Sequence, residues 1–331
     1  MRAISVHEDT QVAEARRAAV FQAQTLGFDQ ANQGRVAIAC TELATNLIKH
    51  GGGGELLIEA FADGAEAGVE LMALDRGPGI ADVNAALRDG HSTSGTPGNG
   101  LGAVSRQANV FDIYSRPGAG SAILARLYPT SDPRRAIRAP RASAVCLPKL
   151  GEEACGDAWW VREDGLGLGL IVVDGLGHGP LAATAAHEAI KVYKASNGLD
   201  GTETIARIHQ ALRPTRGAAA SIASLPDTGD RIEFIGVGNV AGVIVSGREA
   251  RRMVCLNGTL GHAMKAARPF SYDAPGDVIL VLASDGLGTN WSLDAYPGLQ
   301  QRHPSLIAGV LYRDFARGRD DVTVLVAKRA A

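Results

Sequence analysis

Apolar residues recur along the first part of the chain with two different periods. A spacing of three to four residues in Val12–Phe28 and in Gly34–His50, where Val36, Cys40 and Leu43 share one face, predicts two helices. Short apolar runs bounded by Gly, Asp and Pro then predict strands at 55–61, 68–75, 108–116 and 121–129, with a hairpin turn at 118–121. Helices followed by strands favour an α/β sandwich, in which helices cover one face of a sheet.

The second part of the chain is richer in strand patterns. Apolar runs predict strands at 158–163, 167–174, 219–225, 231–239, 241–246, 277–285 and 321–328. Helical spacing predicts helices at Pro180–Ser196, Thr202–Leu212 and Ser305–Phe315. This order favours strands packed between outer helical layers, again of mixed α/β class. A Pro- and Arg-rich stretch without periodicity separates the halves, so we predict domains at 1–129 and 143–331 with a linker at 130–142.

Composition narrows the function classes. The 331 residues carry a net charge of −2, which offers no attraction to nucleic acid or to an anionic membrane. No apolar run approaches the length of a membrane helix, and the N-terminus lacks a signal-peptide pattern. The four cysteines have no CxxC spacing, as expected for reduced thiols. We therefore predict a soluble cytoplasmic protein that binds neither membranes nor nucleic acids.

Three polar or glycine-rich motifs in the first half suit a nucleotide. Glu42 and Asn46 are four residues apart and share a helix face; alone, such a pair is an ordinary polar surface. Asp75 ends an apolar strand, where its carboxylate can accept a hydrogen bond from an exocyclic amine. Two nearby glycines would let the backbone approach a flat ring, and a second glycine-rich loop opens a helix whose N–H groups suit phosphates. These glycine-motif positions are Gly77, Gly79, Gly98, Gly100, Leu101 and Gly102.

The three motifs in this order resemble the GHKL ATP-binding fold, and in particular the small serine kinases of the RsbW and RsbT type. The resemblance covers about Arg16–Leu127. It implies that Glu42 is the catalytic base, that Asn46 holds Mg²⁺ and that Asp75 contacts adenine. It also implies a phosphate lid at residues 98–102. Two interpretations remain open, an active kinase with ATP and Mg²⁺ as cofactors, or an ATP-dependent clamp for a partner.

Aspartates at strand ends mark a second candidate site in the other half. Converging carboxylates repel one another, and a divalent cation such as Mg²⁺ or Mn²⁺ removes that penalty. The Asp-Gly turn is expected to aim the Gly175 carbonyl at a metal, in a conformation that a bulkier residue would resist. Single Asp-Gly pairs are usually turns, but the whole set favours a two-metal site. The set comprises Asp157, Asp174, Asp285, Asp320 and Asp321.

The aspartate pattern resembles the metal-dependent 2C-type protein phosphatases, in their SpoIIE and RsbX branch, over about Ser143–Lys328. The resemblance implies an α-β-β-α sandwich in which Asp174 bridges two Mn²⁺ or Mg²⁺ ions, with Gly175, Asp285 and Asp320 as further ligands. Asp157 is implied as an additional ligand or as the partner of a metal-bound water, and Asp321 as a support. His178 is either a proton donor to the leaving oxygen or a turn histidine. Larger relatives carry a phosphate-gripping arginine that has no clear counterpart here, Lys149 being the candidate.

A kinase-like half joined to a phosphatase-like half suggests opposing reactions in one signalling circuit. Both resembled families act on STAS-domain proteins, so we predict a metal-dependent serine/threonine phosphatase for a phosphorylated STAS regulator, an anti-anti-sigma or stressosome component. A sigma factor or another downstream regulator is a further expected partner, and the resemblance to RsbW-like kinases allows a homodimer. The first alternative is a catalytically weak partner-switching scaffold that binds ATP and STAS proteins. The second is a sensor-kinase remnant joined to a phosphatase for another substrate.

Overall fold

A computed structural model describes residues 1–63, 66–87, 100–130, 140–197, 200–264 and 266–329. Its internal contacts divide the chain into two compact units. The first consists of Met1–Pro140 with Gln301–Arg313, and the second of Arg141–Gln300 with Asp314–Ala331. In the described residues no helix is both long and apolar enough to cross a bilayer.

The first unit is built on an antiparallel five-stranded sheet in the order β1-β2-β3-β5-β4. The strands are β1 (Arg2–Val6), β2 (Gly54–Asp63), β3 (Glu66–Leu74), β4 (Val110–Ser115) and β5 (Ser121–Leu127). The helices are α1 (Asp9–Thr25), α2 (Gln30–Lys49), α3 (Val83–Ala86) and α4 (Gly100–Gln107). The expected α/β sandwich is confirmed, and β1 is an additional strand that the sequence pattern did not indicate.

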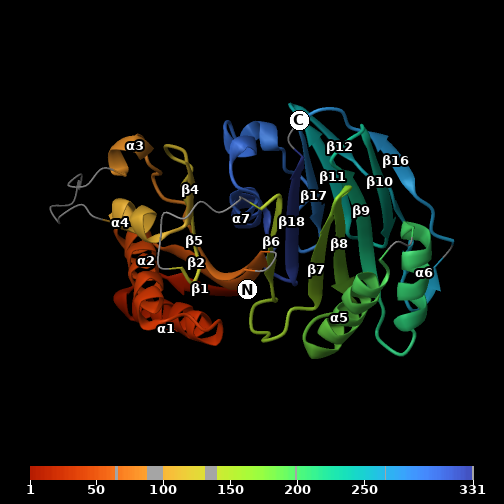
Figure 1. Cartoon of the computed structure of the whole chain (residues 1–331), viewed down its shortest axis with the longest axis horizontal. Helices are drawn as coiled ribbons and strands as arrows, with labels where there is room; N and C mark the ends of the chain where they lie inside the picture. Colours follow the sequence, from red (N-terminus) through yellow and green to blue (C-terminus); the bar gives the residue numbers. More distant parts are fainter. Residues whose placement is uncertain (64–65, 88–99, 131–139, 198–199, 265, 330–331) are drawn as a thin grey trace. The chain divides into compact units, whose positions relative to one another are not determined.

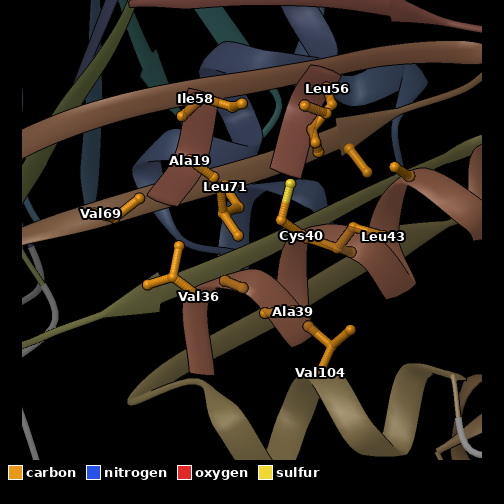
Figure 2. Packing of buried hydrophobic residues seen from close by; sticks show 14 of the residues in the cluster. Ala19, Val36, Ala39, Cys40, Leu43, Leu56, Ile58, Val69, Leu71 and Val104 are labelled. Atoms are coloured by element: carbon orange, nitrogen blue, oxygen red, sulfur yellow. The ribbon is translucent and has the colours of Figure 1, made fainter. Parts of the chain in front are cut away.

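Helix α2 forms the centre of the first unit's core. Asp29 caps it by accepting a hydrogen bond from the Asn32 backbone N–H at 2.8 Å, which satisfies one of the donors left open at a helix start. The apolar face of α2 then packs on β2 and β3, and Figure 2 shows Cys40 and Leu43 pointing toward the strand side chains. Helix and sheet thus bury the apolar face of α2 that the helical spacing predicts. This packing fixes the direction in which the polar face of α2 points.

Strand β3 is buried on both of its faces. Leu71 belongs to the core shared with α1 and α2, whereas the next residue, Met72, points to the opposite face because side chains alternate along a strand. There it meets α7 (Pro304–Phe315), where a Cβ added to Gly309 would lie 2.2 Å from Met72 Sδ. Only a glycine permits this close packing, so most of α7 belongs to the first unit.

A buried polar cluster also joins α7 to this sheet. Glu70 Oε2 accepts hydrogen bonds from Arg126 Nε at 2.6 Å and from Ser305 Oγ at 2.8 Å. All three residues are almost fully buried, so removing one partner would leave a buried polar group unsatisfied. The domains predicted from the sequence place residues 143–331 together. In the structure, residues 301–313 belong to the first unit because of these contacts.

The second unit contains two β-sheets packed face to face, whose strands pair antiparallel except for the parallel pair β10 and β13. One sheet has the order β13-β10-β9-β8-β7, with β16 beside β10, and the other has the order β12-β11-β17-β18-β6. The first sheet's strands are β7 (Asp157–Asp164), β8 (Gly167–Gly175), β9 (Ala218–Pro226), β10 (Arg231–Val237), β13 (Cys255–Leu256) and β16 (Phe270–Asp273). The second sheet's strands are β6 (Ala142–Leu147), β11 (Ala241–Ser246), β12 (Glu249–Arg252), β17 (Val278–Ala283) and β18 (Val322–Arg329).

Strand β8 shows how the second unit is layered. Leu170 and Val172 lie in the core between the two sheets, whereas Ile171 and Val173 face the helices. These helices are α5 (Pro180–Ala195) and α6 (Gly201–Ala211), which Figure 1 shows in green on the outer face of the first sheet. The remaining elements are the short strands β14 (Gly258–Thr259) and β15 (Ala263–Met264) and two 3-10 turns at Leu293–Ala295 and Leu299–Gln301.

The predicted linker overlaps the first strand of the second unit by one residue. Strand β6 begins at Ala142, the last residue of the stretch expected to be a linker, and pairs with β18. Most of that stretch, residues 131–139, lies outside the described residues. All four cysteines are free thiols, as the absence of CxxC spacing predicts.

Candidate functional site

Glu42 and Asn46 lie one turn apart on α2, at the start of α4. A Cβ added to Gly100, the first residue of α4, would lie 3.1 Å from Asn46 Oδ1 and 3.5 Å from Glu42 Oε2. Asn46 Nδ2 is buried and has no hydrogen-bond partner among the described residues. An unsatisfied buried amide is costly, and a ligand that accepts its hydrogen bond would remove that cost. The structure therefore brings these two polar groups together beside a glycine, as a nucleotide and its cation would require.

Asp75 lies just after β3 and is 8% exposed. Its Oδ1 accepts hydrogen bonds from the backbone N–H groups of Gly77 at 2.8 Å and Ser121 at 3.2 Å, which hold the carboxylate in one orientation. Gly77 permits this turn because a Cβ there would lie 2.7 Å from Gly51 O, and Gly79 has a φ of +71°. The glycines thus allow close backbone packing around the carboxylate, as the motif predicts.

The glycine-rich loop is only partly described. Gly100, Leu101 and Gly102 form the first turn of α4, where unpaired backbone N–H groups favour an anion. Gly98 lies outside the described residues. The helix start therefore stands next to Glu42 and Asn46, which agrees with the order of motifs in the sequence.

The second candidate site begins with a cross-strand pair of aspartates. Asp157 opens β7 and lies directly opposite Asp174 near the end of β8, so both side chains point to the same face of the sheet. Asp174 continues the alternation of Leu170 and Val172, which places both carboxylates on the face that packs against the other sheet. The aspartates therefore lie where the interface between the two sheets ends.

The other sheet brings its own aspartates to this end. Strands β17 and β18 are neighbours, and Asp285 follows one while Asp320 and Asp321 precede the other. Ser284 Oγ donates a 2.6 Å hydrogen bond to Asp157 Oδ2, which joins the two sheets at the cluster. The strand order thus gathers the five aspartates that the sequence singled out; together they form the acidic cluster, namely Asp157, Asp174, Asp285, Asp320 and Asp321.

Burial and mutual repulsion make the acidic cluster hard to ionise. Burial and the negative charges of the other four aspartates together raise the pKa of Asp174 to about 8. Burial likewise raises the pKa of Asp157 to about 7, against the hydrogen bond from Ser284. The pKa of Asp321 is also raised by burial, although the backbone N–H of Lys149 opposes the shift. A bound cation would strongly favour the ionised form of carboxylates whose pKa values are raised in this way.

The chemistry of these side chains fits a divalent metal ion. In the described residues no three acidic, His or Cys side chains already surround one point at ligand distances. Repulsion between the carboxylates keeps them from converging on one point, and a bound cation would turn this repulsion into attraction. Carboxylate and carbonyl oxygens are the ligands that Mg²⁺ and Mn²⁺ prefer. The residues of the acidic cluster therefore suit these ions, on the grounds of donor type and charge.

Gly175 is needed for a different reason from the one expected. It still belongs to β8 and is absent from the glycines with positive φ, which in this loop are Gly177 at +88° and Gly179 at +75°. A Cβ added to Gly175 would lie 2.2 Å from the carbonyl oxygen of Ala182. Close approach of the α5 backbone, rather than a strained turn at Gly175 itself, therefore excludes a side chain.

The loop after Gly175 contains a contact that sequence reasoning missed. His178 Nδ1 lies 2.6 Å from Glu152 Oε1, and the His178 side chain is 45% exposed. The positive charge of a protonated His178 would favour ionised Asp321, so the two side chains lie near one another. Lys149 contacts the cluster through its backbone, since its N–H donates to Asp321 Oδ1 at 2.8 Å. Glu152 precedes His178 by 26 residues and gave no sequence signal.

The raised pKa values predict how stability depends on pH without metal. Asp174 and Asp157 hold protons more tightly in the folded chain than in the unfolded one, where Asp titrates near 4. Their contribution is fully present below that value and is lost as pH rises through about 7 to 8. We expect the free energy of unfolding of wild type, relative to Asp174→Asn, to fall by about 2 kcal/mol between pH 5 and pH 8.

Urea unfolding of both proteins in a chelating buffer measures this difference. Because each pH value compares wild type with the variant, titration of groups outside the acidic cluster cancels. An unchanged or increasing difference would show that the carboxylates of the acidic cluster do not repel one another as the structure indicates.

Comparisons with known proteins find relatives for both halves of the chain. Residues 6–126 match the family model described as the histidine kinase-like ATPase domain, and residues 164–330 match that of stage II sporulation protein E (SpoIIE). The first half is 36% identical over 122 residues to the serine/threonine-protein kinase RsbT of Bacillus subtilis, covering 37% of this chain and 92% of RsbT.

A second relative matches another part of the chain. The phosphoserine phosphatase RsbX of Bacillus subtilis is 33% identical over 103 residues, which is 30% of this chain and half of RsbX. A structure titled as the bacterial stressosome, a modular system adapted to control secondary messenger signalling, matches with a TM-score of 0.54 and 26% identity. It covers 56% of this chain and 98% of its own. The similarities thus extend over both halves of the chain.

Proposed function

Because the chain belongs to the SpoIIE phosphatase family and carries an RsbT-type kinase-like ATPase domain, we propose that it removes phosphate from a serine or threonine of a STAS-domain regulator. In this proposal the two halves act in one partner-switching circuit, in which the ATPase half phosphorylates or docks the regulator. The substrate, its sigma-factor or other downstream partners, the cytoplasmic location and a homodimer remain predictions.

The acidic cluster is the observation that carries the phosphatase proposal. Asp174 would bridge two Mn²⁺ or Mg²⁺ ions, with the Gly175 carbonyl, Asp285 and Asp320 as further ligands. Asp157 and Asp321 would complete or support the set. Such ions, when bound, neutralise phosphoryl charge and make water a better nucleophile. A scaffold without catalysis would gain nothing from carboxylates whose pKa values are raised this far, which argues against the scaffold alternative.

In the ATPase half, the residues around Gly100 would bind ATP with Mg²⁺. Asn46 would hold the cation, Asp75 the adenine amine, and the start of α4 the phosphates. Glu42 would accept the proton of an attacking serine hydroxyl, which is the role of a general base. The orphaned Asn46 amide and the fixed Asp75 carboxylate support nucleotide binding in this pocket.

Exposed leucines around the acidic cluster favour a protein substrate. Leu150 is 91% exposed and Leu181 is 58% exposed, and they lie two residues from Glu152 and Gly179, respectively. These two segments are in contact, since a Cβ added to Gly179 would lie 2.8 Å from Glu152 Oε2. Exposed apolar side chains at the rim of a catalytic site are typical of surfaces that bind other proteins.

We expect Mn²⁺-dependent release of phosphate from a phosphorylated STAS protein. The double variant Leu150→Ser/Leu181→Ser should lower kcat/KM for this phosphoprotein about tenfold and leave hydrolysis of an aryl phosphate unchanged, because only the protein reaches the leucines. Leu166→Ser removes a leucine that is 82% exposed at the far end of β7 and β8, and serves as the matched control. Equal loss on both substrates would contradict a docking role, and no phosphate release from any phosphoprotein would contradict the proposed function.

A further inference from the structure

Arg216 lies beside the loop that follows the acidic cluster. A Cβ added to Gly177 would lie 3.1 Å from Arg216 Nη1, so the guanidinium occupies space that a side chain at position 177 would contest. Gly177 lies between Asp174 and His178, and its φ of +88° turns the chain at this point. The guanidinium therefore lies next to the backbone that joins the acidic cluster to the exposed histidine.

The backbone around Arg216 is held firmly on both sides. The carbonyl oxygen of Arg216 lies 2.8 Å from His262 Nε2, and the next carbonyl, that of Gly217, accepts a 3.0 Å hydrogen bond from the Leu176 N–H. One residue further on, Ala218 pairs with Gly175 in the ladder between β8 and β9. Arg216 is therefore fixed near the acidic cluster by backbone contacts that do not use its side chain.

The side chain of Arg216 is exposed and has no carboxylate partner within the described parts of the chain. Arg213, which lies on the same connection between α6 and β9, is also exposed. A guanidinium without such a partner keeps its hydrogen-bond donors available, in the fork geometry that suits phosphate.

Charge also favours a cationic side chain near this site. The acidic cluster gathers five carboxylates, which would repel a phosphate group wherever their charge is not neutralised. A cation that is not bound to the aspartates changes this balance. Lys149 does not fill the role through any side-chain contact, because its contact with the cluster is through its backbone N–H.

We infer that the Arg216 guanidinium binds the phosphoryl oxygens of the substrate and holds the phosphate over the acidic cluster. The inference rests on the proposed phosphatase function and names the residue that recognises the phosphate. The ligand class is a phosphate monoester or its product, inorganic phosphate.

The test compares Arg216→Ala with Arg213→Ala in the full-length protein. With an aryl phosphate and Mn²⁺, we expect Arg216→Ala to lower kcat/KM by about 10- to 100-fold, the range for losing a hydrogen bond to a charged group. The Ki for inorganic phosphate should rise by a similar factor, and Arg216→Lys should recover part of the loss. Arg213→Ala should behave as wild type, and Mn²⁺ binding, followed by the metal-dependent rise in Tm, should be unchanged in all three.

An unchanged kcat/KM and Ki in Arg216→Ala would overturn the inference, and so would a loss of Mn²⁺ binding, which would indicate a structural role. If wild type shows no metal-dependent hydrolysis, the proposed function itself fails. Inorganic phosphate added to the Mn²⁺-loaded protein then still tests the inference, because it should raise Tm in wild type and in Arg213→Ala but not in Arg216→Ala.

Discussion

Replacing Asp174 with Asn is expected to lower Mn²⁺-dependent phosphatase activity by more than about 100-fold, since even changes outside a metal's ligand shell approach this loss. Asn keeps the size of the side chain but removes a negative charge and an oxygen ligand from the centre of the acidic cluster. Asp174 lies opposite Asp157 and is affected by four other carboxylates, so no neighbour can take its place without moving. The variant should lose metal binding and activity together.

The measurement is hydrolysis of an aryl phosphate by wild type and variant, with titration of Mn²⁺ in parallel. Asp164→Asn is the matched control, because Asp164 lies at the other end of β7 and caps a turn that Asn can also form. Unfolding does not explain the expected loss, since Asp174→Asn should be the more stable protein at pH 8 without metal. Full activity in the variant would exclude Asp174 as a metal ligand, and repeating the assay with ATP shows whether nucleotide affects the reaction.

Local sequence patterns predicted most of the secondary structure. The helical spacing of α2 and the apolar runs of β8, β17 and β18 each mark elements that the structure contains at nearly the same positions. These patterns succeed because each element buries a face whose period is visible within ten to twenty residues. The aspartates were found for the same reason, since a carboxylate that follows a buried strand is conspicuous.

Features that depend on distant pairing gave no local signal. Strand β6 follows an Arg- and Pro-rich stretch, and it is a strand because β18, about 180 residues later, supplies its partner. The placement of α7 in the first unit depends on Gly309 and Ser305, whose partners lie on β3 and β5. An apolar helix pattern predicts that α7 is buried but does not say against which sheet.

The missed site residues share this explanation. Arg216 and Gly177 are far apart in sequence and meet because β8 and β9 are adjacent strands. The local pattern at Arg216 is an arginine followed by a glycine before an apolar strand, and many chains contain this pattern. Glu152 was missed likewise, because it reaches His178 from the loop between β6 and β7. Spacing within a motif marked the proposed metal ligands, whereas the groups proposed to contact the phosphate come from other elements of the chain.

In the ATPase half, Glu42→Gln is expected to lower transfer of phosphate from ATP to a STAS protein by about 10²- to 10⁴-fold while nucleotide binding is retained. Gln keeps the shape of the side chain but cannot accept the proton of a serine hydroxyl. Asn46→Ala should instead weaken binding of ATP in the presence of Mg²⁺, because Asn46 presents its amide toward the start of α4 and has a buried nitrogen without a partner. The two variants therefore separate catalysis from binding within one helix.

The experiment combines ATP titration with transfer of labelled phosphate to a STAS protein. Glu14→Gln, on the exposed face of α1, controls for loss of a glutamate charge in this unit. Phosphate transfer that is unchanged in Glu42→Gln would remove Glu42 as the base. If wild type binds ATP but transfers no phosphate, and Asn46→Ala also releases the STAS protein, then the pocket serves as a nucleotide-dependent clamp. The ATPase half would in that case bind the regulator, and the proposed catalysis would belong to the phosphatase half.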